Sequence, residues 1–200
     1  MMIMDDVIDD IEDLIRTLGY ESVRKRAVKE LVRIGEPAVL PLIDALKAGN
    51  PNLTRQGAAM ALGEIRDVRA IEPLVEVLMK DELSIREAAV DAVAKIGEPA
   101  VRRLIKALKD GDEYTRYWVA GALVDIGAPA VGPLVEESRK AGNEHLRREI
   151  SKILEKIDYE AKEKQHDFGV REKSVIRAPK IPDEFQKLML DKTVKVKVSI

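Results

Sequence analysis

The chain offers few side chains that could carry catalysis or hold a metal ion. Its 200 residues include two histidines and no cysteine. His145 stands in "EHL" and His166 in "QHD", so the two imidazoles belong to different segments and neither precedes a glutamate. Transition-metal sites need several converging imidazole or thiolate ligands. We therefore predict no metal site, no cofactor and no catalytic residue, and disulfides are excluded.

The acidic and glycine-containing stretches also lack the spacing that catalysis or phosphate binding requires. Paired carboxylates fall on segments with helical periodicity, where they are typical of solvated faces. The glycines of "LGEI" and "IGEP" stand at the ends of those segments and form neither GxGxxG nor GxxxxGK[ST]. These residues favour a protein without enzymatic activity.

A local cluster of bases is the feature that could contact nucleic acid. The stretch "VRRLIKALKD" carries Arg102, Arg103, Lys106 and Lys109. The corresponding stretches "EPLVEVL" and "VEES" are acidic, and the formal net charge of the chain is −2. Phosphate binding favours several adjacent bases along one surface. Nucleic acid is therefore not the partner that we expect.

Tyr114, Tyr117 and Trp118 form a group of aromatic residues in "YTRYWVAGAL". Their spacing of i, i+3 and i+4 brings side chains together on a helix. The positions that correspond to Tyr117 elsewhere in the chain are polar, which predicts that this ring faces solvent. Aromatic clusters often anchor interfaces. Three explanations stay open, namely core packing, docking of the C-terminal segment and contact with an external partner.

These side chains must be positioned by elements that repeat along the chain. The stretch "IGEPAVLPLIDAL" at 34–46 returns as "IGEPAVRRLIKAL" at 96–108. Related copies lie between and after these two, and one more is centred near Ile11. Within each copy the apolar residues recur at three- and four-residue spacing, which indicates amphipathic helices. A glycine that ends one helix and a proline that starts the next divide each copy in two.

The pattern predicts an all-α fold with no strand between residues 5 and 158. A short helix pair cannot bury its apolar side alone, whereas stacked pairs share a continuous core. A second proline about one turn into the later helix, at Pro41, Pro73 and Pro133, predicts a kink there. The ten predicted helices cover residues 5–18, 21–34, 37–49, 52–65, 69–80, 82–96, 99–110, 112–126, 129–141 and 143–163.

One arginine recurs at the same register in every copy, ten residues before a terminal isoleucine. We predict a structural arginine ladder in which the guanidinium pairs with a carboxylate two residues past the aligned leucine, broken where Lys106 takes the place of that carboxylate. The alternative is that the arginines bind the last carbonyls of the preceding helix. The ladder arginines are Arg24, Arg55, Arg86, Arg116 and Arg147. The predicted pairs are Asp13–Arg24, Asp44–Arg55, Glu76–Arg86 and Glu136–Arg147.

The repeated unit, densest in "TRQGAAMALGEIRDVRAIEPLVEVL", resembles the HEAT-like repeat of the phycobilisome (PBS) lyase type. The resemblance spans residues 20–158 and implies a right-handed α-solenoid of five two-helix repeats, whose second helices line a concave face. Repeats of this kind serve adaptors, lyases, hydroxylases and nucleic-acid enzymes, so the resemblance is specific for fold rather than for function. The hydroxylases use paired His-Glu motifs, which neither histidine of this chain provides.

The sequence changes in character after the last repeat. We divide the chain into a repeat domain at 1–163 and a C-terminal extension at 164–200. Within the extension, "GVREKSVI" and "KTVKVKVSI" are typical of strands, and "IPDEFQKLML" of a short helix. Such a segment is too small to fold alone. We expect it to cap the last repeats, to bind a partner, or to pair with a second copy through its terminal strand.

From these patterns we predict a protein–protein interaction scaffold or adaptor. Alternatives are a lyase-type enzyme subunit acting on a protein-bound cofactor, and a nucleic-acid-binding repeat protein. No apolar run is long enough to span a membrane, so we expect a cytoplasmic protein. The high share of charged residues, 35%, resembles the composition of thermophile proteins. The expected partner contacts on the concave face are Asp44, Glu72, Glu76, Arg102, Lys106 and Glu136.

Overall fold

The structure is a computed structural model and describes residues 4–168 of the chain. Ten α-helices follow one another in this part, and none of its residues forms a strand, so the predicted all-α repeat fold is confirmed. The strand-like stretches and the helix predicted within 169–200 lie outside the described residues. The chain divides into two compact units, Met1–Ile126 and Gly127–Ile200, which are described separately.

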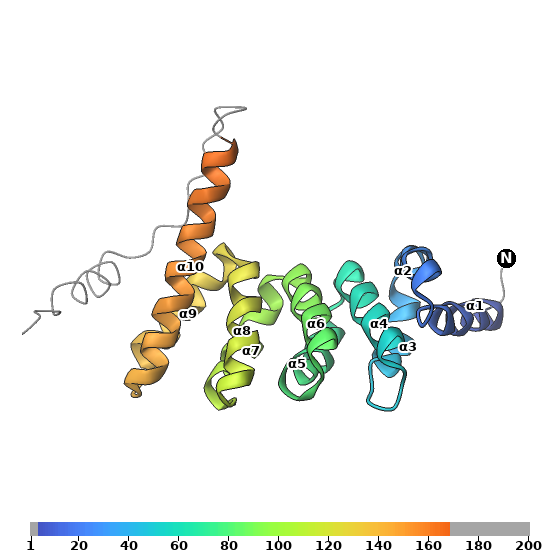
Figure 1. Cartoon of the computed structure of the whole chain (residues 1–200), viewed down its shortest axis with the longest axis horizontal. Coiled ribbons are helices and arrows are strands. Elements are labelled where there is room, and N and C mark those ends of the chain that lie inside the picture. Colours follow the sequence, from blue (N-terminus) through green and yellow to red (C-terminus); the bar gives the residue numbers. More distant parts are fainter. Residues whose placement is uncertain (1–3, 169–200) are drawn as a thin grey trace, which may run out of the picture. The chain divides into compact units, whose positions relative to one another are not determined.

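The first unit contains four helix pairs in two layers (Figure 1). Each even-numbered helix packs against the odd-numbered helix before it. In addition, α2 packs on α4, α4 on α6, and α6 on α8. The odd-numbered helices form the other layer. The helices are α1 (Met4–Thr17), α2 (Glu21–Ile34), α3 (Val39–Ala45), α4 (Asn52–Ile65), α5 (Ile71–Lys80), α6 (Leu83–Ile96), α7 (Val101–Asp110) and α8 (Glu113–Ile126).

The prolines act at the start of the odd-numbered helices rather than bending them. A 3₁₀ turn precedes α3, α5 and α7, over Glu36–Ala38, Val68–Ala70 and Glu98–Ala100. Pro41 and Pro73 therefore fall in the first turn of the α-helix that follows, where the missing N–H removes no intrahelical bond. The predicted kink is wrong at these two positions. Pro133 does lie inside its helix.

Glycine ends three of the even-numbered helices because the backbone there takes a positive φ. The φ of Gly35, Gly97 and Gly127 lies between 72° and 81°, and their ψ lies between −127° and −137°. A side chain at Cβ disfavours this conformation. Arg66 ends α4 instead in the ordinary left-handed region, at φ 60° and ψ 28°. The chain therefore leaves α4 by a different turn from its counterparts.

The core is built from the repeated apolar column. The aligned leucines Leu42, Leu74 and Leu104 are fully buried, and Ile11 occupies the same place in α1. Between α4 and α6 the layer is held together by close contact of small residues. A Cβ added at Gly63 would lie 2.6 Å from the Cα of Ala92, so only glycine permits this approach.

The second unit contains one further pair, α9 (Ala128–Lys140) and α10 (Glu144–Phe168), whose helices pack on each other. Leu134, the next aligned leucine, is buried here as well. The helix α10 continues through residue 163, where the repeat domain was predicted to end, up to Phe168. Among the helices that the structure describes, none combines the length and the apolar character needed to cross a bilayer.

Candidate functional site

The odd-numbered layer of the first unit carries five of the six predicted partner contacts. Asp44 lies on α3, Glu72 and Glu76 on α5, and Arg102 and Lys106 on α7, and all five side chains are exposed. The repeat places them there, because each stands two residues before or after an aligned leucine that is buried in the core. The sixth residue, Glu136, lies on α9 of the second unit, where it is exposed and pairs with Lys140 at 2.5 Å.

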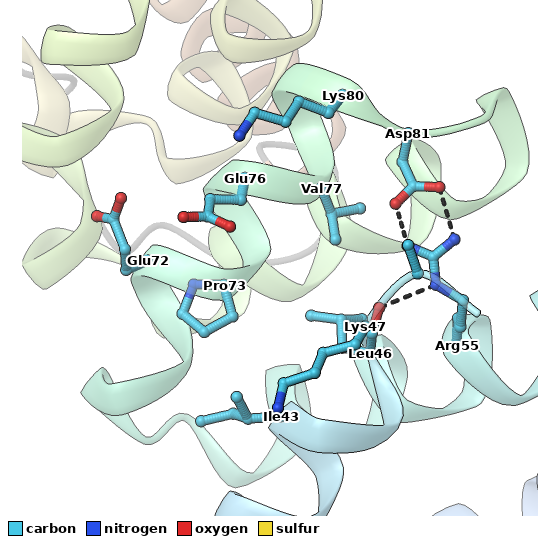
Figure 2. A pocket seen from close by; sticks show the side chains of 11 residues that line it. Ile43, Leu46, Lys47, Arg55, Glu72, Pro73, Glu76, Val77, Lys80 and Asp81 are labelled. Atoms are coloured by element: carbon cyan, nitrogen blue, oxygen red, sulfur yellow. Dashed lines mark hydrogen bonds and ion pairs between the residues drawn. The ribbon is translucent and has the colours of Figure 1, made fainter. Parts of the chain in front are cut away.

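A groove of about 320 Å³ lies between α3 and α5 (Figure 2). Its apolar lining comes from Ile43 and Leu46 on one side and from Pro73 and Val77 on the other. Four charged side chains line it as well, namely Lys47, Glu72, Glu76 and Lys80. A concave apolar surface with a few charged groups around it is the usual form of a binding site.

Arg55 and Asp81 also line the groove, and they are charged as well (Figure 2). Arg55 donates through Nε to the carbonyl of Leu46 at 2.9 Å and through NH1 to Oδ1 of Asp81 at 2.7 Å. Its NH2 donates to the other carboxylate oxygen. Burial alone would raise the pKa of Asp81, but hydrogen bonds from Arg55 and from the Glu82 N–H outweigh it and lower that pKa. The pair is therefore ionised and orders this part of the lining.

The arginine column corrects the predicted ladder. Arg55 pairs with Asp81, whereas Asp44 pairs with Lys47 at 2.5 Å. Arg24 donates to the carbonyl of Leu18 at 3.0 Å. The carboxylates of the predicted pairs stand on the exposed side of their helices, whereas these guanidinium groups reach the orphan carbonyls at helix ends.

The remaining arginines of the column follow the same rule, with one exception. Arg86 donates to the carbonyl of Leu78 at 2.6 Å, and Arg116 to that of Gly111 at 2.6 Å. Arg147, in the second unit, is exposed and lies 3.9 Å from Glu144 in the same helix. Carbonyl binding, the alternative explanation, thus describes Arg24, Arg55, Arg86 and Arg116.

Opposite charges on α5 and α7 pair across the helices. Arg103 donates to both carboxylate oxygens of Glu72, at 2.5 and 2.7 Å. The hydrogen bond from Arg103 holds the pKa of Glu72 below its ordinary value. Arg103 belongs to the cluster of bases that could have contacted a phosphate backbone. Its guanidinium is instead paired with Glu72, a carboxylate of the neighbouring repeat. Arg102 and Lys80 are exposed and make no ion pair with any residue within 4–168.

Sequence reasoning missed most of the groove. It found the charged column two residues past the aligned leucine, but not the apolar residues Ile43, Pro73 and Val77 or the base Lys80. The side chains of Ile43 and Pro73 are only partly buried in the folded protein. The signal was a cluster of incompletely buried apolar residues, and finding it requires knowledge of how adjacent repeats are offset.

The aromatic cluster lies on the even-numbered layer, away from the groove. The Trp118 ring makes edge contacts with Tyr114, at 6.3 Å between centroids, and with Tyr117, at 5.4 Å. Tyr114 is 52% exposed and Tyr117 70% exposed. The guanidinium carbon of Arg86 lies 4.6 Å from the centre of the Tyr114 ring. Core packing does not describe Tyr117, so docking of the C-terminal segment and contact with a partner stay as explanations.

Of the two histidines, the structure describes the side chain of His145. His145 is exposed near the start of α10, with Nε2 3.8 Å from Glu149 of the same helix. The side chain of His166 lies outside the described part. No group of three or more metal-binding side chains occurs among the residues that the structure describes.

The fold and the repeat pattern define a class of protein. The family model for HEAT repeats matches residues 8–94 and 76–155, which together make up most of the chain. The chain therefore belongs to the HEAT-repeat family.

Two curated relatives are similar to about half of the chain. The chain is 33% identical over 94 residues to a phycobilisome maturation protein of Synechococcus elongatus, covering 47% of this chain and 45% of the relative. It is 32% identical over 103 residues to the phycocyanin alpha phycocyanobilin lyase CpcF of Synechocystis sp., covering 51% of this chain and 48% of the relative. The chain thus spans about half the length of the curated relatives it matches.

A solved structure shares the fold. It is a chain from the complex of CpcE and CpcF of phycocyanin lyase from Nostoc sp. PCC7120, with a TM-score of 0.50 and 23% identity. The match covers 73% of this chain and 98% of that chain. At this identity the likeness shows the fold alone.

Proposed function

We propose that the chain is a protein-binding subunit of a lyase-type assembly that handles a bilin-carrying protein. The relatives named as a phycobilisome maturation protein and a phycocyanin lyase support this assignment over about half of their length. The observation that carries it is the groove between α3 and α5, whose apolar lining is open to a partner and whose Lys80 makes no ion pair with a residue that the structure describes.

The size of the groove favours a protein segment as its occupant. A volume of about 320 Å³ lies at the lower end of the range for small-molecule sites, which is roughly 300–1,000 Å³. That space suits one or two side chains of a partner rather than a whole tetrapyrrole. The groove would then bind the protein substrate or a second subunit, and the bilin would be bound outside this groove.

The charges around the groove suit selective binding. Lys80 and Arg102 are exposed cations without an ion pair to a described residue, and the carboxylate of Glu76 lies on the same layer. Such a mixture accelerates association and rejects mismatched partners more than it adds affinity. Binding should therefore weaken as salt is raised, since exposed charges are screened within about 10 Å at 0.1 M ionic strength.

The test is direct binding of the full chain to phycocyanin alpha subunit and to CpcE- and CpcF-type lyase subunits, measured by surface plasmon resonance. Lys80→Glu should weaken binding about tenfold, which corresponds to about 1.4 kcal/mol. The matched control is Lys29→Glu, which reverses an exposed lysine on α2 of the other layer and should leave binding unchanged. Failure to bind any of these proteins, or equal loss in both variants, would contradict the proposal.

A second candidate is a non-enzymatic adaptor that uses the same face. The observation in its favour is the Glu72–Arg103 pair, which joins α5 to α7 beside the groove. The two functions separate when free phycocyanobilin is added to the assembled proteins and its covalent attachment is followed by absorbance. Attachment that depends on this chain supports the lyase assignment, whereas binding without attachment supports the adaptor.

A further inference from the structure

A second surface, formed by α6 and α8 on the even-numbered layer, combines exposed aromatic rings with carboxylates. We call it the acidic aromatic surface and define it as Glu87 and Asp91 of α6 and Glu113, Tyr114 and Tyr117 of α8. All five side chains are exposed, and the two helices pack on each other. The surface lies on the opposite layer from the groove.

The carboxylates of this surface are uncompensated. Glu87, Asp91 and Glu113 make no ion pair with a residue of the described part. The cations near them in sequence are engaged elsewhere. Arg86 and Arg116 donate to the carbonyls of Leu78 and Gly111, and Lys95, four residues past Asp91, pairs with Glu64 at 2.8 Å. The repeated arginine thus leaves the outer face with a net negative charge.

The aromatic rings supply what carboxylates alone would lack, namely area and geometry. Tyrosine is enriched among the residues that dominate binding energy at interfaces. The rings are also held in place, because Tyr114 and Tyr117 both pack edge-on against Trp118. Arg86 lies over one ring at 4.6 Å, which shows that this cluster accommodates a guanidinium.

We infer that the acidic aromatic surface docks a basic polypeptide segment of another protein, in which arginine or lysine alternates with apolar residues. The cations would pair with Glu87, Asp91 and Glu113 and stack on the exposed faces of the tyrosines. The apolar residues would cover the rings. Charge complementarity selects this partner, because an acidic segment or a nucleic acid would be repelled by the same carboxylates.

The single tryptophan of the chain gives this surface its own reporter. Trp118 lies 5.4 Å from Tyr117, so an occupant of the surface should change tryptophan emission. The full chain is titrated with two synthetic peptides of equal length, one with arginine, lysine and leucine and one with glutamate in place of each base. The basic peptide should bind and change the emission, and the acidic peptide should not.

Variants locate the binding. Tyr117→Ala and Glu87→Gln should each weaken binding of the basic peptide about tenfold, the loss expected for an interface anchor. Tyr20→Ala is the matched control, since Tyr20 is 68% exposed and lies at the start of α2, outside the acidic aromatic surface. Equal binding of the two peptides, or equal loss in Tyr117→Ala and Tyr20→Ala, would overturn the inference.

Two other occupants are outcomes of the same experiment. If the chain binds the basic peptide only after Lys192, Lys195 and Lys197 are replaced by glutamine, its own terminal stretch is the occupant. If the chain fails to bind the peptide and self-associates in light scattering unless Tyr117 is replaced, a second copy is the occupant. Either result overturns the assignment to another protein.

Discussion

Arg55 of α4 and Asp81, at the end of α5, form a two-fold hydrogen-bonded ion pair between adjacent repeats. Their side chains are only 7% and 14% exposed. The same guanidinium holds the carbonyl of Leu46 in its own repeat. One side chain thus joins the end of α3 to the end of α5.

Arg55→Ala should therefore be the most damaging charge deletion in the first unit. It leaves the largely buried carboxylate of Asp81 without its partner and the carbonyl of Leu46 without this donor, a change that costs about 3–5 kcal/mol for a buried pair. The free energy of unfolding from urea titration measures it. Arg102→Ala removes an exposed arginine that makes no ion pair within the described part of the chain, and it should change that energy by less than about 0.5 kcal/mol. Equal effects in the two variants would show that the pair adds nothing.

The pair also predicts a pH dependence. The pKa of Asp81 is lower in the folded protein than in the unfolded chain, where it is about 3.9. The folded state therefore gains stability from this carboxylate above about pH 4 and loses it as the pH falls through the folded value. Asp81→Asn should remove that portion of the acid destabilisation. Urea titrations between neutral pH and pH 3 should show a shallower decline for the variant than for the wild type, and parallel curves would refute the assignment.

Gly63→Ala should destabilise the first unit by overpacking. The new Cβ would lie 2.6 Å from the Cα of Ala92, so α4 and α6 must move apart, at a cost of about 1–3 kcal/mol. Gly121→Ala is the matched control, because nothing lies within 4 Å of its added Cβ and it stands inside α8. That substitution should stabilise by about 0.5–1 kcal/mol through the helical preference of alanine. Thermal unfolding of the two variants should shift in opposite directions.

The Glu72–Arg103 pair should contribute little to stability in spite of its good geometry. The carboxylate side chain is 58% exposed, and exposed pairs typically contribute about 0–1 kcal/mol. Glu72→Gln should therefore change the free energy of unfolding by less than about 1 kcal/mol. Its effect should appear in the binding of a partner to the odd-numbered layer, because it alters the charge of that face. A loss of several kcal/mol in unfolding experiments would refute this division.

The helices were predictable from sequence because the spacing of apolar residues and the positions of glycine and proline indicate the same helix boundaries. Repeated leucines locate the buried face, and Gly97 and Pro99 mark one helix junction without knowledge of the fold. The predicted helix at 37–49 was too long, because it merged a 3₁₀ turn with α3, which ends at Ala45. Such detail depends on tertiary packing, which a local pattern does not contain.

The partners of side chains were harder to predict than their positions. The register of the arginine column was evident, yet the carboxylate that binds Arg55 stands at 81, a position held by Gly49, Gly111 and Ala141 in other repeats. A repeat average hides such a single substitution. The groove was missed for a related reason, since its lining comes from two repeats whose offset only the structure supplies.

The helices α4 and α6 contact each other along their whole length. Asn52 donates to Glu82 at 2.7 Å near one end, and Lys95 donates to Glu64 at 2.8 Å near the other. Gly63 and Ala92 touch between α4 and α6, and the buried Arg55–Asp81 pair joins α4 to the end of α5. In a repeat protein each repeat contacts only its neighbours. Unfolding therefore starts at the junction with the weakest contacts and spreads from there. Heating should therefore fray the chain from outer repeats inward, and amide hydrogens of α4 and α6 should be the last to exchange.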